Sequence, residues 1–228
     1  IAGDSRPGDN LYSNSVVALE PATGKLRWHF QFTPNDTHDW DANQVPTLTQ
    51  LEHGGRTRKV MLWPNRNAFF YLLDRETGEY LLSAPFAKQN WAKGIQPDGR
   101  PVVDPDMVTS TVGKVTWPSP MGAMNWQSAT FSPRTGLFYI PALEWGQIVY
   151  RDERPAEYVP LRNFLGGGHR AGPGAGAFFF SVRALDPRTG RIAWSHDLPP
   201  RPAWWKTGGL RSTAGDILFG GDDTELFV

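Results

Sequence analysis

Short runs of alternating apolar and polar residues, separated by turn residues, fill most of the chain. Four of these runs share one pattern: an apolar stretch, an Asp, Glu or Ser, a short polar link, Thr-Gly, and a second apolar stretch. They are VVALEPATGKLRW (16–28), FFYLLDRETGEYLL (69–82), SATFSPRTGLFYI (128–140) and SVRALDPRTGRIAW (181–194). Alternation with a period of two is typical of half-buried strands. Each run therefore predicts a β-hairpin.

The turn of each predicted hairpin contains a glycine, at Gly24, Gly78, Gly136 and Gly190. Glycine takes the positive φ that closes a tight hairpin, and the acidic or hydroxyl side chain before it can cap the amides of the turn. The glycines are 54, 58 and 54 residues apart. A fixed period of this length is the signature of a repeat architecture.

Further strands are predicted between these hairpins. QVPTLTQL, KVMLW and AFFYLLD, separated by EHGGRTR and PNRN, read as three strands joined by turns. Four strands per period make one blade of a β-propeller, and blades must stack to bury both of their faces. The sequence thus predicts an all-β fold of propeller blades, with residues 1–228 as a single partial domain of about four blades, truncated at both ends. A complete four-bladed propeller is the alternative. Residues 144–180 are expected to be an insertion, with loop structure in GGGHRAGPGAG.

Composition agrees with this architecture and excludes several classes of function. The 24 Gly and 20 Pro disfavour long helices, and 10 Trp indicate either a repeated packing device or a site that stacks rings. Equal numbers of acidic and basic residues, 23 each, argue against a nucleic-acid partner held by bulk charge. The chain has no cysteine, which excludes a disulfide, a Cys nucleophile and a CxxCH haem attachment. No apolar run reaches the roughly 18 residues of a membrane span.

Two carboxylates, Asp39 and Asp41, flank a tryptophan in THDWDANQ. In an extended segment they would project to the same side. Two anions this close favour a neutralising cation, and oxygen ligands suit a hard ion such as calcium or a trivalent ion. A solvated loop in which Asp residues cap turns, as we expect for Asp36, is the alternative. The five histidines show no spacing typical of metal ligands, so we expect them to be structural or exposed.

Two other stretches place polar side chains where a planar ligand could bind. Arg66 lies between two asparagines in WPNRNAFFY, at the start of a predicted strand, and could point inward to a carbonyl or carboxylate. Asn125 and Trp126 follow small residues in MGAMNWQS. The alternatives are a surface turn for Arg66 and a core tryptophan beside a turn asparagine for the second pair.

Taken together, these motifs resemble the PQQ-dependent alcohol dehydrogenases, the quinoprotein methanol and ethanol dehydrogenase family. The resemblance rests on RPGDNLYSNSVVALEPATGKLRWHFQFTPNDTHDWDANQ, WPNRNAFFYLLDRETGEYL, PFAKQNWAKG, GAMNWQSATFSPRTGLFY, VRALDPRTGRIAW and STAGDILFGGDD, in family order. It implies about half of an eight-bladed propeller with pyrroloquinoline quinone (PQQ) in a central funnel. It also implies oxidation of a small primary alcohol to an aldehyde, with hydride transfer to metal-bound PQQ.

The resemblance assigns roles to individual residues. Asp39 matches the catalytic base and a metal ligand, and Asp41 matches the extra aspartate that accompanies lanthanide use, with calcium as the alternative metal. Arg66, Asn125 and Trp126 match positions that contact PQQ. Electrons would pass to a cytochrome c or a quinone, in the bacterial periplasm, and a homodimer is possible. No nucleic acid and no membrane span is expected.

The chain departs from the family pattern in ways that limit what it would do alone. The family's glutamate and asparagine metal ligands, its PQQ-stacking tryptophan and its adjacent-cysteine ring would precede residue 1. Thr207 stands where some members place a tryptophan against the cofactor, and Trp204 and Trp205 lie just upstream. We therefore expect this chain by itself to bind PQQ weakly or not at all, and to be inactive alone.

Two other functions remain open from the sequence. A non-catalytic propeller that binds protein or peptide would need the hairpins and tryptophan packing, but would have no use for inward-facing charges. A sugar or polyol dehydrogenase on the same cofactor would differ in loops that set substrate range. Convergence of Asp39, Asp41, Arg66 and Asn125 would favour the dehydrogenases over the scaffold.

Overall fold

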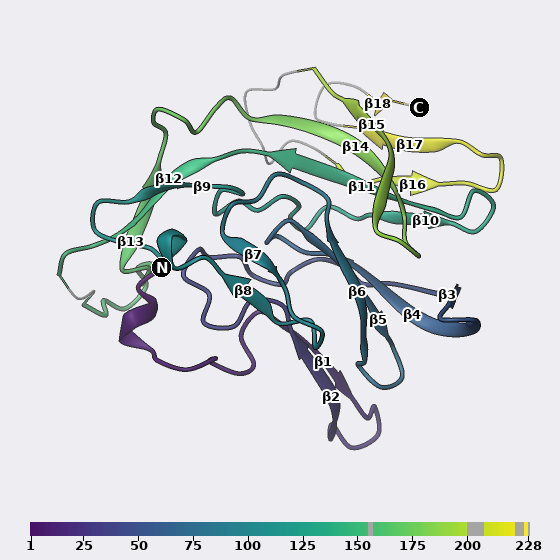
Figure 1. The fold of residues 1–228 in the computed structure, drawn as a ribbon, viewed down its shortest axis with the longest axis horizontal. Helices are drawn as coiled ribbons and strands as arrows, with labels where there is room; N and C mark the ends of the chain where they lie inside the picture. Colours follow the sequence, from purple (N-terminus) through teal and green to yellow (C-terminus); the bar gives the residue numbers. More distant parts are fainter. Residues whose placement is uncertain (155–156, 200–207, 222–225, 228) are drawn as a thin grey trace.

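The computed structural model describes residues 1–154, 157–199, 208–221 and 226–227, and these are organised as β-sheets (Figure 1). Helical structure within those ranges is limited to two 3-10 turns, Gly3–Ser5 and Pro105–Met107. No helix in the described ranges has the length and apolar character needed to cross a lipid bilayer.

The strands run as follows along the chain: β1 (Ser15–Leu19), β2 (Leu26–Gln31), β3 (Thr47–His53), β4 (Arg56–Pro64), β5 (Phe69–Asp74), β6 (Tyr80–Pro85), β7 (Ala92–Ile95), β8 (Pro101–Val103), β9 (Lys114–Thr116), β10 (Thr130–Ser132), β11 (Leu137–Glu144), β12 (Gln147–Arg151), β13 (Gly167–Arg170), β14 (Phe179–Asp186), β15 (Arg191–Asp197), β16 (Arg211–Ser212), β17 (Leu218–Gly221) and β18 (Leu226–Phe227). They form antiparallel sheets, among them two of four strands, β3-β4-β5-β6 and β10-β11-β14-β15.

The hairpin β1-β2, the sheet β3-β4-β5-β6, the sheet β10-β11-β14-β15 and the hairpin β16-β17 follow one another in space as in sequence (Figure 1). Side chains on alternate positions of β4 and β5 explain how the first four-stranded sheet fits between its neighbours. Leu62 and Leu72 belong to one buried cluster, whereas Trp63 and Tyr71 belong to another. Because successive residues of a strand point to opposite faces, both faces of this sheet are buried. Stacked four-stranded sheets of this kind are propeller blades, which confirms the predicted all-β propeller architecture.

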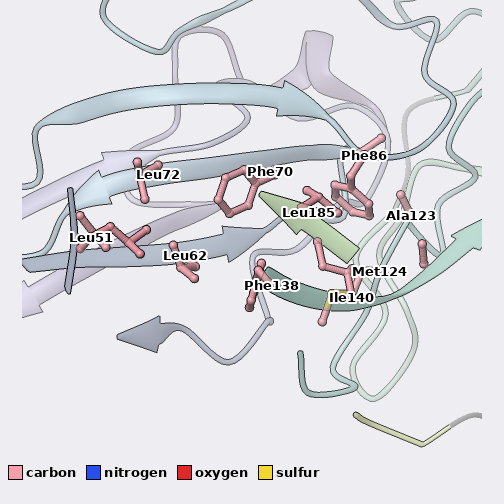
Figure 2. Packing of buried hydrophobic residues seen from close by; sticks show 13 residues of the cluster. Leu51, Leu62, Phe70, Leu72, Phe86, Ala123, Met124, Phe138, Ile140 and Leu185 are labelled. Carbon is pink, nitrogen blue, oxygen red and sulfur yellow. The ribbon is translucent and has the colours of Figure 1, made fainter. Parts of the chain in front are cut away.

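The cluster in Figure 2 joins the two four-stranded sheets. Phe70 of β5 lies 5.8 Å from Phe138 of β11 between ring centroids. Ile140 of β11 and Leu185 of β14 fill the same interface and have no exposed surface. Fully burying side chains of this size is worth about 1.5–3 kcal/mol each. This interface therefore fixes the position of one blade against the next.

The four Thr-Gly hairpins adopt the turn that the sequence predicts. Gly24, Gly78, Gly136 and Gly190 have φ values of 67°, 77°, 70° and 71°. In each hairpin the glycine amide donates to the carbonyl four residues earlier, at 2.8–2.9 Å. The predicted side-chain cap is present at Asp74, which accepts from the amides of Glu76 and Thr77.

The regular spacing predicts four equivalent hairpins, one in each blade. The structure shows that they are not equivalent. Two of them, β10-β11 and β14-β15, belong to the same four-stranded sheet. The prediction of one Thr-Gly hairpin per blade is wrong for this pair. The spacing stays near 54 residues because the chain leaves this sheet between β11 and β14 to form β12 and β13.

The segment predicted as a flexible glycine-rich loop contains a strand. Gly167–Arg170 forms β13, which pairs with β12, and β12 in turn pairs with β9. Added Cβ atoms on Gly167 and Gly168 would meet the backbone and side chain of Tyr150 in β12 at 2.3 and 2.8 Å. The glycines therefore allow the close approach of two strands, a role that composition alone does not distinguish from loop structure.

Candidate functional site

Three connecting segments meet at one end of the two four-stranded sheets. In the antiparallel sheet β3-β4-β5-β6, the start of β3, the end of β4 and the start of β5 lie at the same end, because Thr47 pairs with Leu62 and Pro64 with Phe70. The β2-β3 link, the β4-β5 turn and the segment between β9 and β10 carry the candidate residues. Hydrogen bonds between these segments bring those residues together.

The β2-β3 link is held by the carboxylate of Asp36, which is buried. Its Oδ1 accepts from the amide of His38 at 2.7 Å, and its Oδ2 accepts from the amide of Trp40 at 2.6 Å. These two amides lie on either side of Asp39 in sequence. The expectation that Asp36 caps a turn is confirmed, and the cap fixes the backbone around the candidate base.

Trp40 is fully buried and anchors the β2-β3 link. Its ring stacks on His38 at 4.3 Å between centroids, and its indole nitrogen donates to the carbonyl of Ser119 at 2.9 Å. Burial lowers the pKa of His38, with its partner Asp36 opposing the shift. His38 is therefore a buried structural residue, as its sequence context indicates.

Asp39 and Asp41 line one hollow of about 250 Å³ together with Asp36 and Arg6. The segment is not an extended strand, because Asp39 has a φ of 67°, in the left-handed region. The predicted geometry of simple alternation is thus wrong, although both carboxylates still border the same space. A non-glycine residue in this conformation is strained and persists only where its surroundings hold it, which here is the task of Asp36 and Trp40.

The carboxylate of Asp41 lies near two other carboxylates and one guanidinium. Partial burial of the carboxylate raises the pKa of Asp41, Arg66 opposes this shift, and the charges of Asp39 and Asp36 add to it. Its side chain retains 66% of its exposure. A cation bound in the hollow would relieve this repulsion.

Arg66 lies in the β4-β5 turn, and its side chain is 6% exposed. Its Nη1 donates to Asp41 Oδ2 at 3.1 Å, and its Nη2 donates to the carbonyl of Pro120. This is the inward-pointing arginine that the sequence suggests, and the alternative of a surface turn is wrong. Within the described ranges the buried Nε of Arg66 has no acceptor.

Asn125 is buried and reaches the same region from the segment before β10. Its Oδ1 accepts from Asn43 Nδ2 at 3.0 Å, and its Nδ2 donates to the carbonyl of Met121 at 3.0 Å. Trp126 beside it is 54% exposed. The alternative of a core tryptophan is therefore wrong, and the ring of Trp126 has a free surface.

Asn43 and Gln44 complete the polar network, although they were not among the predicted site residues. Gln44 Nε2 donates to Asn43 Oδ1 at 3.0 Å, and Gln44 Oε1 accepts from Trp63 Nε1 at 3.1 Å. They link Asn125 to the buried face of β4. The two amides that follow the aspartates in DANQ were the available signal, since amides in a loop between strands need partners when buried.

The oxygen atoms around the hollow fit one side of a hard-cation site. Asp39 and Asp41 supply carboxylates, while both oxygens of Asp36 already accept backbone amides. Across the described residues no group of three or more His, Cys, Asp or Glu forms a metal cluster. Since calcium takes six to eight oxygen ligands, these residues can hold part of the shell only. Trp204, Trp205 and Thr207 lie outside the described residues.

Comparison with known proteins shows what this chain is similar to. Residues 1–94 match the family described as glucose/ethanol/alcohol dehydrogenase, beta-propeller domain. Quinohemoprotein alcohol dehydrogenase ADH IIB of Pseudomonas putida is 40% identical over 218 residues, which is 94% of this chain and 31% of that protein. The 1-butanol dehydrogenase (cytochrome c) of Thauera butanivorans is 35% identical, over 94% of this chain and 32% of that protein.

A solved structure, a europium-containing methanol dehydrogenase, superposes with a TM-score of 0.83 at 32% sequence identity. The superposed region covers 95% of this chain and 38% of the methanol dehydrogenase chain. The chain thus spans about a third of the length of the relatives it matches. Sequence and fold together confirm the resemblance to the PQQ-dependent alcohol dehydrogenase family, and the chain matches a part of the β-propeller of these relatives.

Proposed function

We propose that the protein carrying this chain is a PQQ-dependent alcohol dehydrogenase that oxidises a small primary alcohol to an aldehyde. One observation supports this most directly. Arg66, buried in the β4-β5 turn, donates to Asp41 at the rim of the hollow that Asp39 also lines. Two carboxylates of the β2-β3 link and a guanidinium of the β4-β5 turn therefore meet at one place.

The residues present fit part of a PQQ and metal site. Asp39 and Asp41 would bind the metal ion through their carboxylates, which line the hollow. Arg66, Asn125 and the exposed face of Trp126 would contact the quinone. When bound, PQQ would supply an acceptor for hydride, and the metal ion would supply positive charge to the site.

Asp39 would act as the base that accepts the hydroxyl proton of the alcohol. Its backbone is held by the amides on both sides of it, which donate to Asp36, so its carboxylate is oriented before the substrate arrives. A base fixed within hydrogen-bonding reach of the proton it removes typically contributes about 10²–10⁴-fold to a rate.

Asp41 supports use of a trivalent lanthanide, with calcium as the alternative. It adds a second negative charge beside Asp39, and Arg66 is its cationic partner. A higher ligand charge suits a cation of higher charge. The europium content of one structural relative agrees with this choice.

The name of one relative supports a proposal for the electron acceptor. The butanol dehydrogenase of Thauera butanivorans is named for cytochrome c, and we propose a cytochrome c, or a quinone, as the acceptor for this protein. Location in the bacterial periplasm and association as a homodimer are parts of the same proposal.

The test is dye-linked alcohol oxidation by the full-length protein, supplied with PQQ and either lanthanum or calcium. We expect activity with lanthanum to exceed activity with calcium. Asp39→Asn should lose about 10²-fold or more of kcat while PQQ still binds. Full activity of Asp39→Asn would contradict the role of this residue, and absence of PQQ binding by the unmodified protein would contradict the function.

The alternative of a non-catalytic scaffold is not favoured, because the matched relatives are dehydrogenases and the predicted charged residues converge. A sugar or polyol dehydrogenase would share the same site. Assays of glucose and glycerol beside ethanol and butanol would separate these substrate classes.

A further inference from the structure

Three consecutive carbonyls in the turn Ser119–Gly122 each accept a hydrogen bond from a different candidate site element. The Ser119 carbonyl accepts from the indole of Trp40 at 2.9 Å. The Pro120 carbonyl accepts from Arg66, and the Met121 carbonyl accepts from the side-chain amide of Asn125 at 3.0 Å. We infer that this turn is the positioning element of the site, which holds Trp40, Arg66 and Asn125 in register with one another.

Each of the three contacts controls a different part of the site. Trp40 stands between Asp39 and Asp41, so its anchor sets the depth of both carboxylates in the hollow. The Arg66 contact directs the rest of the guanidinium toward Asp41. The Asn125 contact orients the amide whose oxygen accepts from Asn43. A shift of the turn would therefore move all three elements together.

The turn is built to stay in place. The amide of Gly122 donates to the Ser119 carbonyl at 2.8 Å, and the amide of Met121 donates to the Ser119 hydroxyl at 3.2 Å. The amide of Ser119 donates to the carbonyl of Trp145, which follows β11, at 2.7 Å. Ser119 has no exposed surface. The turn is thereby tied to the second four-stranded sheet, while Trp40 and Arg66 come from other segments and Asn125 follows the turn in the same segment.

Gly122 shows how closely the turn fits Arg66. Its φ is 80°, and a Cβ added there would lie 2.6 Å from both Cβ and Cγ of Arg66. The amide of Ala123, next in sequence, donates to the Arg66 carbonyl at 2.9 Å. The backbone of the turn thus runs directly against the stem of the arginine, and a larger residue would displace one or the other.

The first test compares Gly122→Ala with Gly190→Ala in the full-length protein. Gly190 also has a positive φ, 71°, and its added Cβ would lie 2.4 Å from Ala84 Cβ in β6. The control therefore introduces similar backbone strain and crowding away from the site. Crystal structures should show loss of the Arg66–Asp41 contact in Gly122→Ala only. The dissociation constant for PQQ, from equilibrium titration with metal present, should rise about tenfold or more in Gly122→Ala and less than about twofold in Gly190→Ala.

A milder pair of variants covers the case in which Gly122→Ala does not fold. Ser119→Ala removes the hydroxyl that accepts from Met121, whereas Ser132→Ala removes a comparable acceptor for Thr135 in the β10-β11 turn. NMR hydrogen exchange of the Trp40 indole proton should accelerate about threefold or more in Ser119→Ala, and it should stay unchanged in Ser132→Ala.

These measurements separate the inference from the proposed function on which its catalytic meaning rests. If the unmodified protein binds no PQQ, the function fails, while the crystal contacts and indole exchange still judge the turn. Joint displacement of Trp40, Arg66 and Asn125 supports the inference. It is overturned if Gly122→Ala or Ser119→Ala leaves these contacts and the indole exchange unchanged, or if Arg66 moves while Trp40 and Asn125 stay in place.

Discussion

Two buried arginines in this protein make the same kind of contact and reach different results. Arg183 of β14 donates to Glu144 at 2.7 Å and to the carbonyl of Phe86. Arg66 donates to Asp41 at 3.1 Å and to the carbonyl of Pro120. The carboxylate of Glu144 is 10% exposed, whereas that of Asp41 is 66% exposed.

The difference in exposure separates a structural pair from one that can bind a ligand. Glu144 uses both oxygens, since it also accepts from the amide of Lys88 at 3.1 and 3.2 Å, and so ties the segment after β6 to the next blade. Asp41 accepts from Arg66 with one oxygen, and its side chain lines the hollow. A buried arginine is therefore weak evidence for a site until the exposure of its partner is known.

The largest expected effect is on the buried ion pair Arg183–Glu144. Glu144→Gln removes the counter-charge of a sheltered guanidinium, which should lower the free energy of unfolding by about 3–5 kcal/mol. Urea denaturation measures it. The control is Glu76→Gln, which alters an ion pair with Lys59 whose side chains are 61% and 49% exposed, and should cost less than about 1 kcal/mol. Equal losses of stability in both variants would contradict the distinction between buried and exposed ion pairs.

A smaller effect is expected from Arg66→Lys. The lysine keeps the charge but lacks the fork that reaches Asp41 and Pro120 together, so the free energy of unfolding should fall by about 1.5–3 kcal/mol. PQQ affinity should fall with it. The matched variant is Arg134→Lys, in an exposed pair with Asp216, which should be nearly neutral in both measurements. Unchanged PQQ affinity in Arg66→Lys would place the guanidinium outside the cofactor shell.

Asp41→Asn should change stability by less than about 1 kcal/mol, because the carboxylate it replaces is mostly hydrated. Its effect should instead appear in metal preference. The ratio of activity with lanthanum to activity with calcium should fall, since the site loses one negative charge. A stability loss as large as that of Glu144→Gln would mean that the Asp41 pair is structural as well.

The smallest effect is a dependence of stability on pH that differs in sign between two aspartates. The pKa of Asp41 is raised above its ordinary value of 3.8, so the folded protein holds this proton more tightly and its contribution to stability falls as pH rises through the raised pKa. The pKa of Asp9 is lowered by its hydrogen bonds from Arg100, so its contribution is present above 3.8 and is lost as pH falls through the lowered pKa.

Urea unfolding in metal-free buffer between about pH 3 and pH 6 checks both signs. The stability of the unmodified protein relative to Asp41→Asn should decrease with rising pH. Its stability relative to Asp9→Asn should increase. The same sign for both differences would contradict the opposite environments of the two carboxylates.

Local patterns of the chain determined the secondary structure and much of the list of site residues. Alternation of apolar residues located β3, β4 and β5, and each Thr-Gly turn formed because glycine alone tolerates its φ without strain. The buried cap by Asp36 was also predictable, since it depends on residues two and four positions away. The family resemblance pointed to Asp39, Asp41, Arg66, Asn125 and Trp126, and their functional roles stay predictions.

Only the tertiary structure decided how these pieces combine. The regular spacing of glycines did not reveal that two hairpins share one sheet, because strand pairing depends on contacts between residues far apart in sequence. Spacing suggested that Asp39 and Asp41 face one side of a strand, but a left-handed residue held by Asp36 and Trp40 brings them to the hollow. The turn Ser119–Gly122 carries no chemical motif. Its carbonyls acquire their role from where the fold places them, since every residue has a carbonyl and only its neighbours in space determine what it accepts.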